Sequence, residues 1–456
     1  MRWNGKLSCH PRKRSARFAA SDRRRMDPRQ TALFPKEEDR VKTTTRTSTT
    51  FADNRKLPIH RWFRYSAGFS ALWVQDVIES RQGGGRVAVF DPFTGSGTVQ
   101  LAAERCGVES IGLEPHPFVW RIAKAKLAWR VPSADLQLAG EEILGRAQSY
   151  EIRELQYPPL VRKCFPDASL ARLDALRRAW LETPLSDSLH DLIWLALASI
   201  LRESSPVGTA QWQYVLPNKS KSGVSDPFFA FARKVAIMCE DMRIRQGEPN
   251  GPGAKVLQAD ARECAGVPDA WASLIITSPP YANNFDYADA TRLEMTFFGE
   301  VERWRDLQTV VRSHLMRSCT QHVTSIVDET DGMVGDPLLL PIRDELREVV
   351  RKLEVERENH AGMKSYHTMI AAYFLDLAQV WRSLRRVCQA GAAVCFVIGD
   401  SAPYGVYVPV DRWLGELAVA AGFKEYRFEK TRDRNVKWKN RKHRVPLHEG
   451  RLWVEG

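Results

Sequence analysis

The stretch Arg86-Val-Ala-Val-Phe-Asp91-Pro-Phe-Thr-Gly-Ser-Gly-Thr98 decides the fold of this chain. Its apolar residues 87–90 are typical of a buried strand, and the glycines that follow predict a tight turn. A helical pattern then covers residues 99–106, and a second apolar run covers residues 110–113. A strand, a glycine-rich turn, a helix and another strand are typical of a βαβ unit, so this stretch predicts a parallel sheet.

The same alternation continues along the chain. Further strands are predicted at residues 255–260, 273–277, 392–398, 424–430 and 450–454, and further helices at 118–129, 366–388 and 410–421. No helix separates the last two strands, which predicts a terminal antiparallel hairpin. The sequence therefore predicts an α/β fold with one seven-stranded, mostly parallel, Rossmann-like sheet.

The same patterns predict four parts of the chain. They are a basic, disordered tail at 1–55, a first part of the sheet domain at 56–132, a mostly helical insertion at 133–250, and a second part of the sheet domain at 251–456. The last part includes a polar, partly helical insertion at 300–362 and a basic loop at 432–444. A loop rich in Pro, Gly, Ser and Lys is expected around residues 217–223 of the helical insertion.

Composition limits the class of protein. The formal net charge is +12, and residues 1–30 carry ten Lys and Arg against two Asp and Glu, which leaves +8 of that charge in this segment. A positive charge favours a polyanionic partner such as nucleic acid. The eight cysteines include no C-x-x-C pair and the ten histidines no H-x-x-x-H pair, so we predict no disulfide framework and no metal. Without an apolar run of membrane-spanning length or a signal core, we expect a cytoplasmic protein with no membrane partner.

The glycine-rich turn is the first candidate site. Gly95 and Gly97 let the backbone approach a ligand at the end of a strand. Glu114 ends the next strand, where a carboxylate can accept hydrogen bonds from the two hydroxyls of a ribose. A dinucleotide-binding fingerprint would need a third glycine where Gln100 stands, which argues against a nicotinamide oxidoreductase. These residues predict a nucleoside-cofactor site, with a purely structural turn as the alternative.

The second candidate site is Thr277-Ser-Pro-Pro-Tyr281, at the end of the apolar run 273–277. Two prolines cannot continue a sheet ladder, so they form a rigid corner that directs Ser278 and Tyr281 into the ligand crevice. The Ser278 hydroxyl and the Pro279 carbonyl can accept hydrogen bonds from an exocyclic amine and localise its lone pair. The Tyr281 ring can stack on an extruded base. An ordinary loop is again the alternative.

Together, Asp-Pro-Phe-x-Gly-Ser-Gly-Thr and Thr-Ser-Pro-Pro-Tyr resemble the cofactor and catalytic motifs of the amino-group DNA methyltransferases. The resemblance covers roughly residues 60–456. It implies S-adenosylmethionine as cofactor, double-stranded DNA as partner and, for such enzymes, often a cognate restriction nuclease. Segment 60–69 would contact the methionine part of the cofactor. The resemblance implies a catalytic set of Ser278, Pro279, Pro280 and Tyr281 and a cofactor-binding set of Asp91, Phe93, Gly95, Ser96, Gly97, Thr98, Glu114 and Asp260.

The family divides by the atom that is methylated. Ser278 before Pro-Pro-Tyr favours cytosine N4, with adenine N6 as the alternative. A cytosine-C5 enzyme would need a nucleophilic Cys after Pro, and no Pro-Cys pair exists in the chain. An RNA amino-methyltransferase and a catalytically silent subunit that positions DNA stay open as other functions.

The segment that reads the DNA target also stays open. Candidates are the insertion 133–250, the segment 283–365 and the basic loop, and residues 283–287 could line a base pocket. The basic loop suits phosphate contacts combined with one stacking ring. Its candidate DNA-binding residues are Arg432, Arg434, Lys437, Trp438, Lys439, Arg441 and Lys442.

Overall fold

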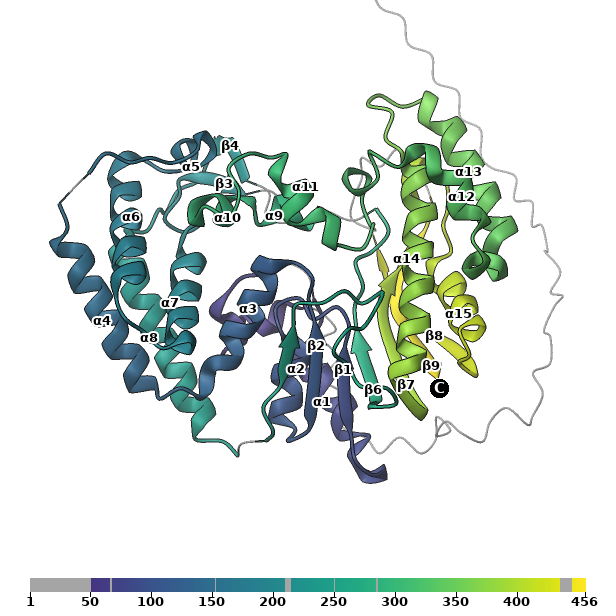
Figure 1. Ribbon diagram of the computed structural model, residues 1–456, viewed down its shortest axis with the longest axis horizontal. Helices are drawn as coiled ribbons and strands as arrows, with labels where there is room; N and C mark the ends of the chain where they lie inside the picture. The colour runs from purple at the N-terminus through teal and green to yellow at the C-terminus, as the bar shows by residue number, and fades with distance from the viewer. Residues whose placement is uncertain are drawn as a thin grey trace, which may run out of the picture. The chain divides into compact units, whose positions relative to one another are not determined.

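One seven-stranded sheet organises the computed structural model, which describes residues 51–65, 68–151, 153–209, 215–249, 251–283, 286–434 and 445–456 (Figure 1). The strand order is β5-β2-β1-β6-β7-β9-β8. Strands from β5 to β7 pair in parallel, and β9 pairs antiparallel with both β7 and β8. The strands are β1 (Ala88–Asp91), β2 (Glu109–Leu113), β5 (Lys255–Leu257), β6 (Ala272–Thr277), β7 (Cys388–Gly399), β8 (Glu425–Arg434) and β9 (Leu447–Glu455). The predicted α/β fold with a mostly parallel seven-stranded sheet is thus confirmed.

Helices cover both faces of this sheet, because successive strand residues point to opposite faces. Val89 belongs to a core with α1 (Ala71–Glu79) and α2 (Thr98–Arg105). Phe90, the next residue, belongs to a core on the other face with α14 (Tyr366–Val387) and α15 (Val410–Ala420). The carboxyl ends of the parallel strands therefore meet at one edge between the two layers, where ligands bind in such sheets.

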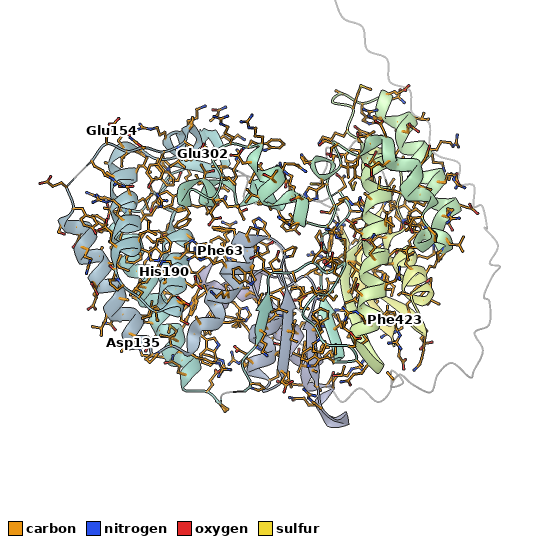
Figure 2. The ribbon with its side chains drawn as sticks, in the orientation of Figure 1. Phe63, Asp135, Glu154, His190, Glu302 and Phe423 are labelled. Carbon is orange, nitrogen blue, oxygen red and sulfur yellow. The ribbon has the colours of Figure 1, made fainter. Side chains whose placement is uncertain are left out.

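The insertion between β2 and β5 packs against α3 (Pro117–Leu127) in one hydrophobic core. Phe63, labelled in Figure 2, packs its ring against Phe118 of α3, with the ring centroids 6.2 Å apart. The insertion contains α4 (Ser133–Ser149), α5 (Pro159–Cys164), α6 (Asp167–Glu182), α7 (Asp187–Ile200) and α8 (Pro227–Gln246). Contacts among residues place everything from Thr47 to Gly456 in one unit.

The insertion also contains a two-stranded antiparallel ribbon, β3 (Val207–Thr209) and β4 (Val215–Ser220). The sequence had predicted a loop where β4 lies. Asn218, Lys219 and Ser220 are exposed, so this strand lacks the alternation of buried and exposed residues that reveals a strand in a sequence. Pro217 is compatible with an edge strand, where its missing N–H faces no partner.

The segment between β6 and α14 is a series of helices, most of them short, and it includes residues 300–362. Its elements are α9 (Tyr287–Ala290), α10 (Arg292–Phe298), α11 (Asp306–Val310), η8 (Arg312–His314), η9 (Thr320–His322), η10 (Val327–Glu329), α12 (Thr330–Gly335), η11 (Pro337–Ile342) and α13 (Arg343–Glu358). The remaining 3₁₀ helices are η3 (Phe51–Lys56), η4 (His60–Trp62), η5 (Gln82–Gly84), η6 (Ala128–Arg130) and η12 (Pro403–Gly405). In the described ranges no helix combines the length and the apolar character needed to span a membrane.

Candidate functional site

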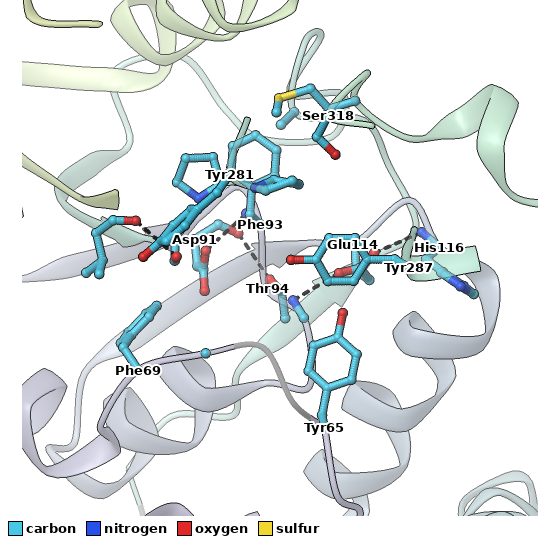
Figure 3. Close-up of a pocket in the computed structure, with 18 of the residues that line it drawn as sticks. Tyr65, Phe69, Asp91, Phe93, Thr94, Glu114, His116, Tyr281, Tyr287 and Ser318 are labelled. Carbon is cyan, nitrogen blue, oxygen red and sulfur yellow. Dashed lines mark hydrogen bonds between the residues drawn. The ribbon is translucent and has the colours of Figure 1, made fainter. Parts of the chain in front are cut away.

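A cavity of about 480 Å³ lies at the carboxyl ends of the parallel strands (Figure 3). Both motifs reach it because β1 and β6 are neighbours in the sheet, although about 180 residues separate them in sequence. The predicted site residues that line the cavity are Asp91, Phe93, Gly95, Ser96, Thr98, Glu114, Asp260, Ser278, Pro279, Pro280, Tyr281, Arg432 and Arg434. The fold therefore brings the two predicted sets together in one space.

The two glycines of the first motif differ in their surroundings. Gly95 has φ +53°, and a Cβ there would lie 3.2 Å from the Tyr65 ring. Gly97 has φ +86° and begins α2, and it does not line the cavity, because a Cβ there would face Ala123 of α3 at 3.5 Å. Gly95 thus permits the close approach of an aromatic ring, and Gly97 permits the turn into α2.

Two buried carboxylates form the floor of the cavity. Asp91 Oδ1 accepts hydrogen bonds from the Phe93 N–H (3.0 Å) and the Thr277 hydroxyl (2.5 Å). Glu114 accepts from the Gly95 N–H and the His116 N–H, each at 2.9 Å. Burial raises the pKa of Asp91 to about 7 and the pKa of Glu114 to about 8. Neither carboxylate forms an ion pair with the described part of the chain. Such a floor favours a ligand that brings its own positive charge and hydroxyl donors.

The segment upstream of β1 supplies aromatic rings to the same cavity. Tyr65, Gly68 and Phe69 line it, as expected for segment 60–69, of which residues 66 and 67 lie outside the described residues. The Tyr65 ring stacks on the Tyr287 ring with centroids 6.4 Å apart (Figure 3). Burial raises the pKa of Tyr65 well above its ordinary value, so this ring stays neutral.

The predicted adenine-binding carboxylate, Asp260, lines the cavity and also has a protein partner. Arg262 donates its backbone N–H to Asp260 Oδ1 (2.8 Å) and its Nε–H to Oδ2 (2.9 Å). Arg262 Nη1 also lies 3.4 Å from Asp376, which accepts the backbone N–H of Arg317 at 2.8 Å. Through Arg262 and Asp376, the Asp260 carboxylate is therefore linked to Arg317 in segment 315–322, on another side of the cavity.

The serine of the second motif is held in one orientation. The Ser278 hydroxyl donates to the backbone carbonyl of Val397 on β7 at 3.0 Å. Because its proton is used in this bond, its oxygen can act as an acceptor toward the cavity. The adjacent Thr277 hydroxyl donates to Asp91, so the second motif is also bonded to the floor carboxylate. The fold thus positions an acceptor oxygen beside a buried negative group.

Arg432 and Arg434, predicted as the start of the basic loop, belong to strand β8 and line the cavity. The Arg434 guanidinium lies 5.1 Å from the centre of the Tyr281 ring and donates to the Asp400 carbonyl at 2.8 Å. Arg432 forms an ion pair with Glu449 at 2.8 Å. The other candidate DNA-binding residues, Lys437, Trp438, Lys439, Arg441 and Lys442, lie outside the described residues.

Asp286, which follows the second motif in sequence, forms a buried cluster with Cys319 and His322. Their potential ligand atoms lie within 4.8 Å of one another, an arrangement that the histidine spacing did not indicate. Asp286 is bonded to the Arg312 guanidinium at 2.6 and 2.9 Å. A metal ion bound here would lie close to that positive charge, which opposes binding.

Sequence reasoning missed one wall of the cavity. Leu315, Met316, Ser318 and His322 line it, all from the region predicted only as a polar insertion. Residues 315, 318 and 322 are spaced as on one face of a helix, but only the 3₁₀ helix η9 forms among them, so a helical pattern did not predict that they line a cavity. Of the segment 283–287, Tyr287 lines the cavity, whereas residues 284 and 285 lie outside the described residues.

The sheet order and the cavity define an α/β protein with a mostly parallel seven-stranded sheet and a cavity at the carboxyl ends of its parallel strands. No model of a protein family matches the chain. The chain is 25% identical to the Type II methyltransferase M.BsoBI of Geobacillus stearothermophilus, over 85% of this chain and 82% of that protein. It is 26% identical to the Type II methyltransferase M.AvaI of Nostoc sp. and to that of Anabaena variabilis, in each case over 82% of this chain and 80% of the relative.

Proposed function

We propose that this chain is an S-adenosylmethionine-dependent DNA methyltransferase that modifies the exocyclic amine of an extruded base, with cytosine N4 as the favoured acceptor. The similarity to Type II methyltransferases over four fifths of the chain supports the methyltransferase reaction and DNA as its substrate. The single observation that carries the proposal is the convergence of the two motifs on one cavity. A cognate restriction nuclease is a proposed partner.

The floor of the cavity fits the proposed cofactor. S-adenosylmethionine supplies a methyl group bonded to a positively charged sulfur, and it carries an amino group and two ribose hydroxyls. Asp91 and Glu114 are buried without a cationic partner in the described ranges, so they can stabilise a positive ligand. In this proposal Glu114 accepts the ribose hydroxyls, Asp91 faces the charged part, and Asp260 accepts from the adenine amino group.

The corner after β6 fits the proposed chemistry. An exocyclic amine is a weak nucleophile because its lone pair is delocalised into the ring. Ser278 Oγ, fixed by its bond to Val397, and the Pro279 carbonyl would accept the two amine hydrogens and localise that lone pair. Tyr281 provides a ring on which the base can stack. These contacts strengthen toward the transition state, so they act on the rate of transfer.

The preference for cytosine N4 over adenine N6 rests on Ser278. The Ser278 hydroxyl donates its proton to the Val397 carbonyl and offers its oxygen as one acceptor. In the methyltransferases that the motif resembles, an Asp or Asn at this place is commonest in the adenine enzymes. Arg432 and Arg434 at the cavity, with the rest of the basic loop, are the proposed contacts to DNA.

The test is transfer of tritium from methyl-labelled S-adenosylmethionine to plasmid DNA, with total RNA as a parallel acceptor. We expect label in DNA and N4-methylcytosine in its nuclease digest by mass spectrometry. Label only in RNA, or none in either nucleic acid, would contradict the proposal. N6-methyladenine as the sole product would correct the base while leaving the reaction in place.

A further inference from the structure

Segment 315–322 is a wall of the cavity to which neither motif assigns a role. It lies between the catalytic corner and the cofactor side. The backbone N–H of Asn283, two residues after Tyr281, donates to the Ser318 carbonyl at 2.9 Å. Arg317 is fixed to Asp376, which also contacts Arg262 beside Asp260. The wall is therefore held rigidly from both sides.

Two buried polar side chains of this wall each have one atom without a hydrogen-bond partner among the described residues. Ser318 is fully buried and lines the cavity, and its hydroxyl has no hydrogen-bond partner among the described residues. Figure 3 shows this hydroxyl directed into the cavity, from the side opposite Tyr65. His322 is also buried and lines the cavity, and its Nε2 is likewise unpartnered in the described ranges. Buried polar groups are nearly always bonded in native proteins, so such a pair indicates groups that a ligand completes.

The contacts of His322 show which protein groups lie beside its two ring nitrogens. His322 Nδ1 lies 3.0 Å from the Met316 carbonyl, which can only accept, so Nδ1 carries a proton. Its Nε2 lies 3.8 Å from Asp286 Oδ1, so that carboxylate is the protein group beside this nitrogen. The Ser318 hydroxyl can donate. The wall thus offers the Ser318 hydroxyl as a donor, with the apolar side chains of Leu315 and Met316 beside it.

We infer that the Ser318 hydroxyl is part of a nucleobase-binding subsite, in which it donates to a ring nitrogen that lies next to an exocyclic amino group. Adenine and cytosine both present this neighbouring acceptor and donor on one edge. The proposed function, on which this inference rests, brings two such rings into the cavity, namely the adenine of the cofactor and the target base. The chemistry of recognition is the same for both.

The test uses Ser318→Ala in the full-length protein, with Ser313→Ala as the matched control. Ser313 is an exposed serine two residues before segment 315–322, and its hydroxyl donates to the Thr309 carbonyl. Because the Ser318 hydroxyl has no protein partner, its removal should leave the melting temperature of the ligand-free protein unchanged or slightly higher. A purely structural role would lower it.

Two measurements then distinguish the two rings. Calorimetric titration with S-adenosylhomocysteine reports on the adenine of the cofactor, and single-turnover tritium transfer to plasmid DNA at saturating cofactor reports on the target base. We expect Ser318→Ala to reduce one of the two about fivefold to tenfold, as for one lost hydrogen bond. Weaker S-adenosylhomocysteine binding would assign the subsite to the cofactor, and slower transfer with unchanged binding would assign it to the target base.

The inference is overturned if Ser318→Ala matches Ser313→Ala in both measurements, or if Ser318→Ala lowers the melting temperature by several degrees. This result differs from failure of the proposed function, which would be seen as absence of methyl transfer by the wild-type protein. In that case the titration with S-adenosylhomocysteine still tests Ser318. A wild-type protein that binds no S-adenosylhomocysteine and methylates no DNA would contradict both.

Discussion

The floor of the cavity and its wall at residues 315–322 are built in opposite ways. The floor comes from strand ends, and its polar groups Asp91, Glu114 and Ser278 are each bonded to nearby protein groups. The wall comes from a segment with short helices. Its polar residues Ser318 and His322 each have one atom without a hydrogen-bond partner within the described residues. The floor is therefore preorganised without a ligand, whereas the wall leaves two polar atoms without a hydrogen bond among the described residues.

This difference predicts different consequences of mutation. Changes in the floor should reduce methyl transfer or cofactor binding strongly, because they disturb groups aligned with the reacting atoms. Changes at the rim of the cavity should have weaker effects.

Replacing Tyr281 by Ala should slow single-turnover methylation about a hundredfold, because base–aromatic stacking contributes about 1–3 kcal/mol and the ring also holds the base in place. Tyr281→Phe, which keeps the ring, should stay within about threefold of the wild type by the same stacking argument. Rapid-quench measurement of tritium transfer gives both rates. Equal losses in the two variants would mean that the hydroxyl, and not the ring, matters.

Replacing Ser278 by Ala should slow the transfer step at least about tenfold, with affinities for DNA and S-adenosylhomocysteine largely kept. The hydroxyl is proposed to act as an acceptor in the transition state, so its loss should appear in the rate and not in binding. Ser313→Ala again serves as the control for a lost surface hydroxyl. Full activity of Ser278→Ala would remove the amine-activation role from the proposal.

Replacing Glu114 by Ala should weaken S-adenosylhomocysteine binding by roughly 1–3 kcal/mol, the scale of lost hydrogen bonds to a charged group. Burial raises the pKa of Glu114 from 4.5 to about 8, so the ligand-free protein holds a proton there below that pH. Ribose hydroxyls prefer the ionised carboxylate, so affinity should rise with pH up to about 8 and then level off. Calorimetry between pH 6 and 9, on the order of three pH units around this pKa, measures the slope.

Glu114→Gln is the control for this pH dependence, since it keeps the shape of the side chain but cannot ionise. In Glu114→Gln, the affinity for S-adenosylhomocysteine should no longer rise with pH between about 7, the pKa of Asp91, and about 8, the pKa of Glu114 in the wild type. The contribution of Glu114 to the free energy of unfolding changes with pH in the opposite direction to the affinity. The raised pKa stabilises the folded state below pH 4.5, and this contribution is lost as the pH rises through about 8. An unchanged slope in Glu114→Gln would place the titrating group elsewhere.

Replacing Arg434 by Ala should slow methylation only about threefold, because its contact with the Tyr281 ring is a partly exposed cation–π interaction worth about 0.5–1 kcal/mol. If Arg434 also contacts phosphate, the slope of log affinity against log salt should fall by about one unit. Lys424→Ala, an exposed cation just before β8, is the control. A loss as large as that of Tyr281→Ala would place Arg434 among the groups that touch the base.

The sequence by itself determined the floor of the cavity. The apolar strand, the positive-φ glycine turn and the double-proline corner are local features, and their backbone geometry follows from residues next to one another. The position of Glu114 followed from the parallel βαβ pattern, because parallel strands end at the same edge. The mostly parallel sheet and the joining of both motifs could therefore be predicted.

Only the tertiary structure decided the wall and the surroundings of the floor. Ser318 faces the cavity because Arg317 is bonded to Asp376, 59 residues away, and because Asn283 donates to the Ser318 carbonyl. Such long-range bonds have no periodic signature in the sequence. The raised pKa of Asp91 likewise depends on burial beneath elements from distant parts of the chain. Local backbone rules reveal where a strand ends, but burial and unpaired polar groups depend on what the whole chain packs around that end.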